Sequence, residues 1–282
     1  MTLYDRLIEL KDASYRTFQM KLVPNIPSET ILGVRTHQMR ALAKEMFEND
    51  EREAFLISLP HQYYEENLIH FFVLAMIKDF DECVRNVEGF LPYVDCWPVS
   101  DQATPKAFRK NHEKRLPYIE IWISSEHVYT ARFGLRMLMN EFLGDGFIQE
   151  YLDLAASNKG TDYYLQMMVA WFFATALAKR YDKTLPFFEE RLLDEWIHKK
   201  SDSESSGKLQ DNGCPQGIST ISEIDRKSYI KQKMRKPVFR LAYLYLEHAY
   251  FLSARSSSSF LFQPSDTDIS QRRLLTASET LS

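Results

Sequence analysis

Residues 126–142 of the chain, EHVYTARFGLRMLMNEF, show most clearly which kind of fold to expect. Apolar residues recur there at the three- and four-residue spacing of an α-helix, and the helical pattern continues from residue 3 to residue 200. Short stretches with glycine or proline separate or open these helices, and no stretch alternates convincingly as a strand would. The sequence therefore predicts an all-α protein.

The expected helices follow one another after short connections, which favours antiparallel helix pairs. A helix-pair period near 35–40 residues predicts a HEAT-like helical-repeat solenoid, an α-α superhelix. Helices are expected near residues 68–77, 104–111, 115–123, 126–142, 147–156, 162–181 and 185–199, and the prolines at 98, 105, 117 and 186 are expected to separate or open helices.

Four residues with distinctive chemistry are spread along this pattern. Trp97 and Asp101 are four residues apart, so they would share one face of a helix. Arg132 follows Trp97 by 35 residues, and Trp171 follows Arg132 by 39. If each repeat contributes to a common surface, that surface presents two indoles, a carboxylate and a guanidinium. Such a surface suits a flat cationic ligand lying beside a phosphate backbone.

The composition is typical of a soluble globular protein. The 282 residues are 45% hydrophobic, with a mean hydropathy of −0.36. No apolar run reaches the roughly 18 residues that span a bilayer, and the first residues show no signal-peptide pattern. The three cysteines, Cys83, Cys96 and Cys214, form no C-x-x-C pair. We therefore expect a cytoplasmic protein with reduced thiols and no contact with membranes.

Several classes of chemistry are disfavoured by what the sequence lacks. It has only 9 glycines and neither a G-x-G-x-x-G nor a Walker motif, which argues against a phosphate-cradling α/β enzyme. Its 7 histidines show no metal-ligand spacing, so we expect neither a metal nor a cofactor. Cys96 has no particular histidine placed beside it and is expected to pack rather than to react. Tyr163 and Tyr164 are likewise expected to pack or to cap a repeat.

Charge places a condition on any nucleic-acid role. The net charge is −4, and residues 1–200 carry 24 Lys and Arg against 30 Asp and Glu, whereas residues 201–282 carry 11 against 9. DNA binding would therefore need a local basic face. Lys106, Arg109 and Lys110 would share one face of a helix at i, i+3 and i+4. They are candidate contacts to the DNA backbone, and the alternative is an ordinary solvated face.

The sequence around these residues resembles the DNA alkylation repair family, the AlkD-like alkylpurine DNA glycosylases built of HEAT-like repeats. The resemblance covers about residues 3–200, and it rests on the four positions occurring in order at family-like spacing. The motifs that carry it are LGVRT at residues 32–36, VDCWPVSD at 94–101, WISSEHVYTAR at 122–132 and QMMVAW at 166–171.

The resemblance implies a concave DNA-binding face that hydrolyses the N-glycosidic bond of 3-methyladenine and 7-methylguanine in double-stranded DNA. It further implies that the base is not fully extruded. Asp101 would stabilise the oxocarbenium-like sugar and orient the attacking water, while Trp97 and Trp171 would line the cleft. Arg132 would grip a phosphate beside the lesion. A monomer without a cofactor, associated with the nucleoid when bound to DNA, is expected.

Alternatives remain open at each of these levels. Asp101 could instead cap a helix or lie on the surface, the two tryptophans could belong to the core, and Arg132 could pair with a carboxylate. The whole chain could be a catalytically silent binder of damaged or branched DNA, or a HEAT-type protein-interaction scaffold. The acidic charge of residues 1–200 suits a scaffold. The presence of Asp101 argues against a silent binder, because binding phosphates requires no anion.

The resemblance ends at residue 200, so we expect a glycosylase domain over residues 1–200 followed by an aberrant tail. Residues 201–282 include serine-rich, low-complexity stretches and match no pattern that continues the repeats. Moving the reading frame forward by one nucleotide from residue 201 permits a peptide that looks like the missing end of the family domain. We therefore expect residues 201–282 to be a largely disordered frameshift product.

Overall fold

The computed structural model describes residues 1–49, 51–144 and 146–198, apart from the side chains of Lys110 and His112. Its described residues form helices and no strand, as the sequence predicts. The expected frameshifted tail lies outside these residues. The elements are α1 (Leu3–Glu9), α2 (Ala13–Leu22), η1 (Ser28–Thr30), α3 (Thr36–Glu48), α4 (Glu51–Ile57), α5 (Tyr64–Leu74), α6 (Phe80–Phe90), η2 (Leu91–Tyr93), α7 (Trp97–Asp101), η3 (Lys106–Lys110), α8 (His112–Ile123), α9 (Val128–Phe142), α10 (Glu150–Ser157), α11 (Tyr163–Lys179) and α12 (Tyr181–Glu189).

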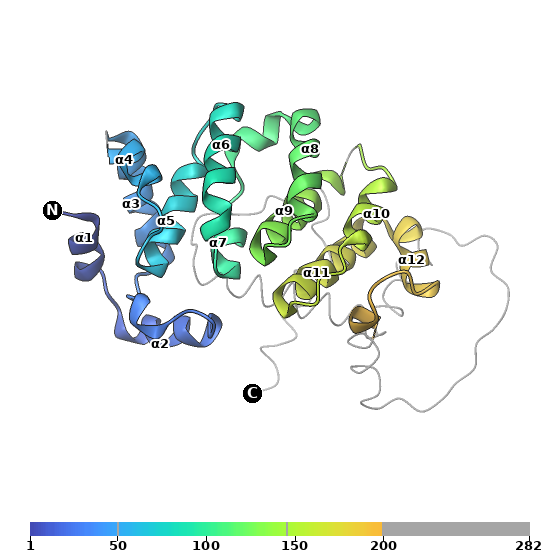
Figure 1. The fold of residues 1–282 in the computed structure, drawn as a ribbon, viewed down its shortest axis with the longest axis horizontal. Helices are drawn as coiled ribbons and strands as arrows, with labels where there is room; N and C mark the ends of the chain where they lie inside the picture. Colours follow the sequence, from blue (N-terminus) through green and yellow to red (C-terminus); the bar gives the residue numbers. More distant parts are fainter. Residues whose placement is uncertain (50, 145, 199–282) are drawn as a thin grey trace, which may run out of the picture.

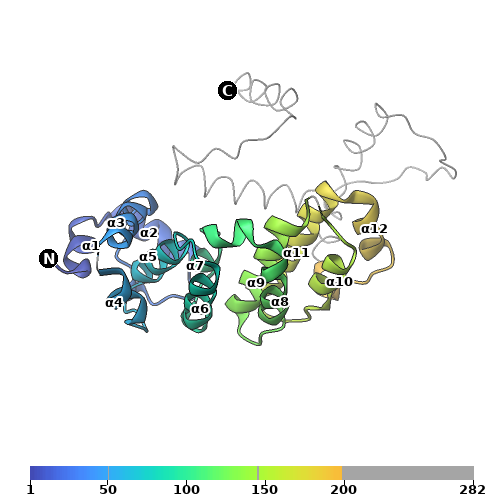
Figure 2. The same cartoon turned by 90° about the horizontal axis from the view of Figure 1, so that it is seen from above.

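The helices follow one another along the long axis of the molecule, from α1 at one end to α12 at the other (Figure 1). Seen from above, α4, α6, α8 and α10 lie along one side, and α5, α7, α9 and α11 lie along the other (Figure 2). Helix α9 packs against α8 across the two rows and against α7 and α11 within its own row. This order is consistent with an α-helical repeat.

The row that contains α9 and α11 forms much of the core. Helix α11 is apolar on nearly all sides, so it is buried on nearly all sides. Its start is fixed by Asp162, whose carboxylate accepts hydrogen bonds from the backbone N–H groups of Tyr164 at 2.8 Å and Leu165 at 3.3 Å. Only a narrow strip of α11 that includes Tyr164, Trp171 and Thr175 is half-buried instead of buried.

Helix α7 is short, and its sequence fixes where it begins. Cys96 precedes it in an extended conformation, and Pro98 lies in the first turn, where a missing N–H group costs no helical hydrogen bond. The helix then runs through Asp101. The expectation that Trp97 and Asp101 share a helix is therefore confirmed, and one turn separates them.

The N-terminal repeat is held by a buried carboxylate. Glu65 of α5 is fully buried and accepts hydrogen bonds from the backbone N–H groups of Leu32 at 3.0 Å, Gly33 at 2.7 Å and Val34 at 3.3 Å. Gly33 has a φ of 88°, and a Cβ atom there would lie 2.5 Å from the Cβ atom of Arg16, so glycine is required. This loop leads directly into α3.

Three local expectations were wrong. The helix expected near residues 104–111 is the 3₁₀ helix η3. The one expected near 185–199 is interrupted, because α12 begins at Tyr181 and ends at Glu189 and residues 195–198 are helical again. Pro117 and Pro186 lie inside α8 and α12 instead of at their ends. Each proline removes one hydrogen bond to the carbonyl four residues earlier, a loss that packing of the surrounding helix offsets. In the described residues, no helix is both long and apolar enough to cross a membrane.

A histidine pair, in which His70 is buried and His61 half-buried, predicts a pH dependence of stability. His61 Nε2 lies 2.8 Å from His70 Nδ1, and burial lowers the pKa of His61 to about 4 and that of His70 to about 3. Below the ordinary histidine pKa of about 6.5 the unfolded chain takes up protons before the folded one does. The contribution of the pair is therefore complete above that pH and falls as the pH drops toward 4.

We expect the melting temperature to fall between pH 7 and pH 4.5, and the fall to be shallower in His61→Phe, which removes one of the two titrating rings. His37, exposed on α3, provides the matched control His37→Gln. Thermal melts of the three proteins across this pH range measure the difference. An identical slope in His61→Phe and the unmodified protein would rule out the pair as its source.

Candidate active site

Three neighbouring helices bring the four predicted residues to one region. Helix α7 carries Trp97 and Asp101, α9 carries Arg132, and α11 carries Trp171. Because α9 packs against both α7 and α11, residues that are 35 and 39 positions apart come from adjacent elements. The helix-pair spacing of the sequence thus becomes a spatial row.

A buried ion pair joins Asp101 to Arg132 at the centre of this row. Arg132 Nη2 lies 2.5 Å from Asp101 Oδ2, and Arg132 Nε lies 3.2 Å from each carboxylate oxygen. Asp101 is 8% exposed and Arg132 is 5% exposed, so both charges have left water. This fork against a carboxylate is the strong, directional form of an ion pair, and it holds the plane of the carboxylate in one orientation.

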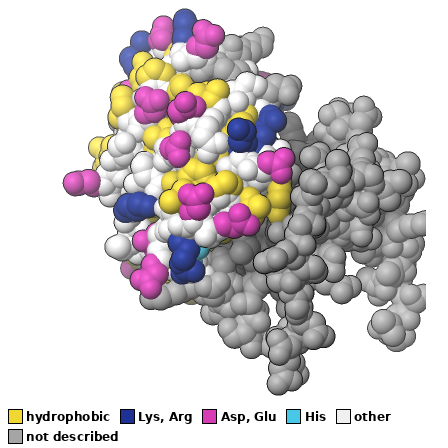
Figure 3. All heavy atoms as spheres, turned by 90° about the vertical axis from the view of Figure 1, so that its right-hand side faces the viewer, with side chains coloured by type: hydrophobic (Ala, Val, Ile, Leu, Met, Phe, Trp, Pro, Cys, Tyr) yellow, Lys and Arg dark blue, Asp and Glu magenta, His cyan; other side chains and the backbone are white. Residues whose placement is uncertain are grey.

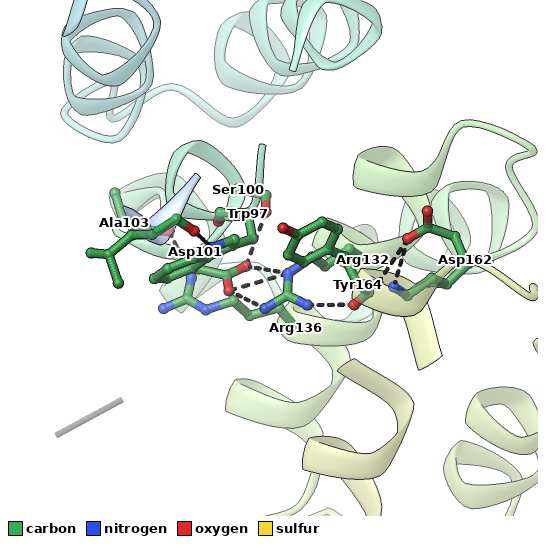
Figure 4. A network of polar contacts seen from close by, with 10 residues as sticks. Trp97, Ser100, Asp101, Ala103, Arg132, Arg136, Asp162 and Tyr164 are labelled. Atoms are coloured by element: carbon green, nitrogen blue, oxygen red, sulfur yellow. Dashed lines mark hydrogen bonds and ion pairs between the residues drawn. The ribbon is translucent and has the colours of Figure 1, made fainter. Parts of the chain in front are cut away.

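Groups from all three helices complete the network (Figure 4). Arg132 Nη1 donates to the backbone carbonyl of Tyr164 at 2.5 Å, which ties α9 to the start of α11. The Ser100 hydroxyl lies 2.9 Å from Asp101 Oδ1 and 3.0 Å from the carbonyl oxygen of Trp97, and donates its single proton to one of them at a time. The network therefore fixes the side chain of Asp101 relative to α7, α9 and α11.

The prediction that Arg132 grips a phosphate does not fit this geometry. Its Nε and Nη2 groups are directed at Asp101, its Nη1 group is directed at a backbone carbonyl, and the side chain is buried. The alternative interpretation, an arginine paired with a carboxylate, describes its contacts. The pairing is buried, however, whereas the sequence suggested a pair on the helix surface.

Arg136 lies one turn after Arg132 on α9 and brings a second guanidinium to the same region. Its Nη1 group donates to the carbonyl of Ala103 at 3.1 Å, and within the described part of the chain it forms no ion pair. Burial lowers the pKa of Arg136, while Asp101 acts to raise it and Arg132 to lower it. Those two influences place Arg136 close enough to feel both charges of the pair.

Both predicted indoles are half-buried, with one side against the core. Trp97 is anchored by a hydrogen bond from Nε1 to the carbonyl of Leu22 at 3.3 Å. Trp171 lies on the half-buried strip of α11. Trp122, by contrast, is 2% exposed and packs in the core. Trp97 and Trp171 therefore retain accessible surface that an ordinary core tryptophan lacks.

Lys106 and Arg109, two of the three basic residues predicted to share a helix face, are exposed on η3, where three residues per turn align positions i and i+3. The side chain of Lys110 is outside the described set. Arg115 is fully buried and lies 3.7 Å from Glu141, so it is a structural residue. Of the residues predicted to contact the DNA backbone, Lys106 and Arg109 are seen to be exposed.

The face of the molecule at its C-terminal end shows how the charges are distributed there. In Figure 3, Asp and Glu side chains alternate with Lys and Arg between hydrophobic patches, and no continuous basic area covers the visible described residues. A cavity of about 480 Å³ lies between the loops that precede α9 and α11, lined by residues such as Ser125, Asn158 and Lys159. None of the four predicted residues lines that cavity, so it is separate from the Asp101 region.

Cys96 and Tyr163 were both predicted to pack. Cys96 is fully buried and burial raises the pKa of its thiol well above the usual range, so its predicted packing role is confirmed. The ring of Tyr163 packs against the rings of Tyr164, at a centroid distance of 5.4 Å, and Trp196, at 6.1 Å, although the residue is 56% exposed. Tyr164 is half-buried and borders the ion pair, which the sequence did not indicate. The described residues contain no group of three or more His, Cys, Asp or Glu that could hold a metal ion.

Comparison with known proteins agrees with the resemblance in the sequence. A family model described as DNA alkylation repair enzyme matches residues 6–206, a span that includes all four predicted residues. No curated protein matches the chain.

The buried ion pair predicts a marked stability difference between two charge-removing substitutions. We expect Arg132→Met to lower the free energy of unfolding by about 3–5 kcal/mol, because it leaves the Asp101 carboxylate buried without its partner. Lys106→Met, which removes an exposed cation, should change it by about 0.5 kcal/mol or less. Urea unfolding followed by circular dichroism measures both. Equal effects would show that the pair is not held as described.

Proposed function

The chain belongs to the DNA alkylation repair enzyme family, and we propose that it is a glycosylase that hydrolyses the N-glycosidic bond of cationic alkylated purines, such as 3-methyladenine and 7-methylguanine, in double-stranded DNA. The observation that carries this proposal is the fixed carboxylate of Asp101 in a row of helices that also presents Trp97 and Trp171. We further propose that these helices form the concave DNA-binding face of a HEAT-like solenoid, which acts as a monomer.

Asp101 is suited to stabilise positive charge and to orient water. An alkylated purine is already cationic, so it leaves without a strong general acid and generates an oxocarbenium-like sugar. An ionised carboxylate has about four acceptor positions, and here Ser100 Oγ, Arg132 Nε and Arg132 Nη2 supply three donors. The remaining position can accept a hydrogen bond from the attacking water. Asp101 would then place that water while its charge stabilises the sugar.

Trp97 and Trp171 are proposed to line the lesion site. An indole face attracts a cation by about 0.5–2 kcal/mol, so two indoles favour the charged lesion over an undamaged base. The same attraction acts on the positive charge that moves to the sugar in the transition state. Their half-buried rings have the accessible surface that this role requires.

Arg132 is proposed to position Asp101. Other cations are proposed to make the phosphate contact that the sequence suggested for Arg132. Arg136 carries a guanidinium next to the pair and forms no ion pair in the described residues. Lys106 and Arg109, exposed on η3, are proposed backbone contacts, and Lys110 is proposed with them from the sequence alone. This assignment separates the residue that orients the carboxylate from those that bind the backbone.

A second candidate is a catalytically silent member that binds damaged or branched DNA. The observation in its favour is the ion pair itself, because Arg132 offsets the charge of the carboxylate that would act on the sugar. A scaffold function has no comparable support in the geometry. Release of methylated purines from alkylated duplex DNA distinguishes the glycosylase from both alternatives.

We expect Asp101→Asn to reduce the release of 7-methylguanine from methylated duplex DNA about 100-fold or more, since the amide keeps the size of the carboxylate but loses its charge. Single-turnover release measures the rate, and a thermal melt of the same variant shows whether it remains folded at the assay temperature. If the unmodified protein releases nothing yet binds DNA in a salt-sensitive way, the silent binder is supported. If the unmodified protein neither releases the base nor binds DNA, the scaffold is supported.

Trp171→Ala is expected to slow single-turnover excision by about tenfold, corresponding to loss of one cation–π contact, while affinity for undamaged duplex changes by less than about threefold. Trp171→Phe keeps an aromatic plate and should retain more of the rate. Comparing excision with binding to undamaged DNA separates the effects. Equal losses in both would contradict a contact with the lesion.

A further inference from the structure

We propose that Tyr164 is a further DNA-binding residue of this site, and that its phenol hydroxyl donates a hydrogen bond to a phosphate oxygen beside the lesion. This inference rests on the proposed function, because it assigns a contact to the same site. It names a group that the sequence analysis placed among packing residues. Four features of the structure lead to it: its place on α11, its contacts with the ion pair, the freedom of its hydroxyl and the local charge.

Tyr164 and Trp171 lie on the same strip of α11. They are seven residues apart, or about two turns, and therefore share a helix face. Both are half-buried, although most of α11 between them is buried and Met168, on the same strip, is fully so. Helix α11, which packs against α9, thus carries two half-buried aromatic side chains on one strip. Only one of them, Trp171, had been assigned a role.

The residue is part of the network around Asp101 through its backbone. Its carbonyl accepts the hydrogen bond from Arg132 Nη1 at 2.5 Å. In Figure 4 the ring of Tyr164 extends from α11 toward the Asp101–Arg132 pair. The ring is held from two sides, with centroid distances of 6.2 Å to Tyr129 and 5.4 Å to Tyr163. Tyr164 is therefore oriented by the fold before any ligand arrives.

The hydroxyl of Tyr164 is available as a donor. Within the described residues it makes no hydrogen bond, whereas Tyr129, its buried neighbour, accepts one from Asn25 Nδ2 at 3.4 Å. Burial raises the pKa of Tyr164, neighbouring Tyr163, Asp162 and Cys96 raise it further, and Arg132 opposes them. The phenol consequently keeps its proton at neutral pH. A protonated phenol can donate to a phosphate oxygen, which only accepts.

The surrounding charges allow an anion to approach. Asp101 and Arg132 offset one another, and Arg136 adds a second guanidinium. Asp162 is the anion closest in sequence, but its carboxylate is directed at backbone N–H groups at the start of α11, as a helix cap. Tyrosine hydroxyls are among the groups that fix DNA backbones in register. Because Arg132 is bound to Asp101, it cannot contact the phosphate, and Tyr164 supplies a neutral contact in its place.

The test compares Tyr164→Phe with Tyr163→Phe, since Tyr163 is the exposed neighbour and its substitution by Phe removes only a hydroxyl while keeping the ring that packs against Tyr164. The probe is a duplex oligonucleotide with one 7-methylguanine. Tyr164→Phe should weaken binding or raise KM about tenfold, the loss expected for a hydrogen bond to a charged group, and leave kcat within about threefold. Tyr163→Phe should match the unmodified protein within twofold.

Salt dependence distinguishes a neutral hydrogen bond to the phosphate from a charged contact. A phenol releases no counterion on binding, so Tyr164→Phe should lower affinity without changing the slope of log affinity against log salt concentration. Arg136→Met should reduce that slope by about one. Tyr164→Gln, which retains a donor on a side chain without the ring, should bind more tightly than Tyr164→Phe. Thermal melts establish that each variant is folded.

The inference is overturned if Tyr164→Phe binds within twofold of the unmodified protein, if Tyr163→Phe loses as much, or if Tyr164→Gln is no better than Tyr164→Phe. Failure of the proposed function gives a different result, because the unmodified protein itself would then release no 7-methylguanine. If only the inference about Tyr164 fails, the unmodified protein releases the base and the variants alone show the failure.

Discussion

The buried pairing of Asp101 with Arg132 is the interaction on which the rest of the site depends. Two charges that are 8% and 5% exposed have lost their hydration, and only good geometry with further hydrogen bonds offsets that cost. Ser100 and the carbonyl of Tyr164 supply those bonds from α7 and α11. Because apolar side chains of similar volume would often be at least as stabilising, the value of the pair lies in the orientation it imposes on a carboxylate.

Because Arg132 holds Asp101 in this orientation, its donor groups are not free to bind a phosphate. A guanidinium has five N–H donors in a fixed fork, and three groups of Arg132 are already directed at Asp101 and a backbone carbonyl. An arginine held this way cannot also follow a mobile phosphate. If the protein binds DNA as proposed, other groups would contact the DNA backbone, and Arg136, on the next turn of α9, is the guanidinium that follows the pair.

The sequence predicted the helices better than their partners, and the reason is physical. Periodicity over residues 126–142 and 162–181 is a local property, so α9 and α11 could be placed within a few residues. The pairing of Arg132 with Asp101, 31 residues earlier, depends on how α9 packs against α7, which no local pattern records. Tyr164 was missed because α11 is apolar on nearly all sides, and such a helix gives no signal of which strip stays accessible.

In the proposed glycosylase reaction, a carboxylate that is already paired would be a weak catalyst, and that weakness would give selectivity. An undamaged purine is neutral and leaves the sugar only if a proton is delivered to it, which a carboxylate held in an ion pair does not provide. A cationic lesion needs no such proton, so a positioned water and modest stabilisation of the sugar suffice. Two half-buried indoles add attraction only for the charged base. Under the proposed function Arg132 would contribute to discrimination: by engaging Asp101 it would leave enough stabilisation to act on a damaged base and too little to act on a normal one.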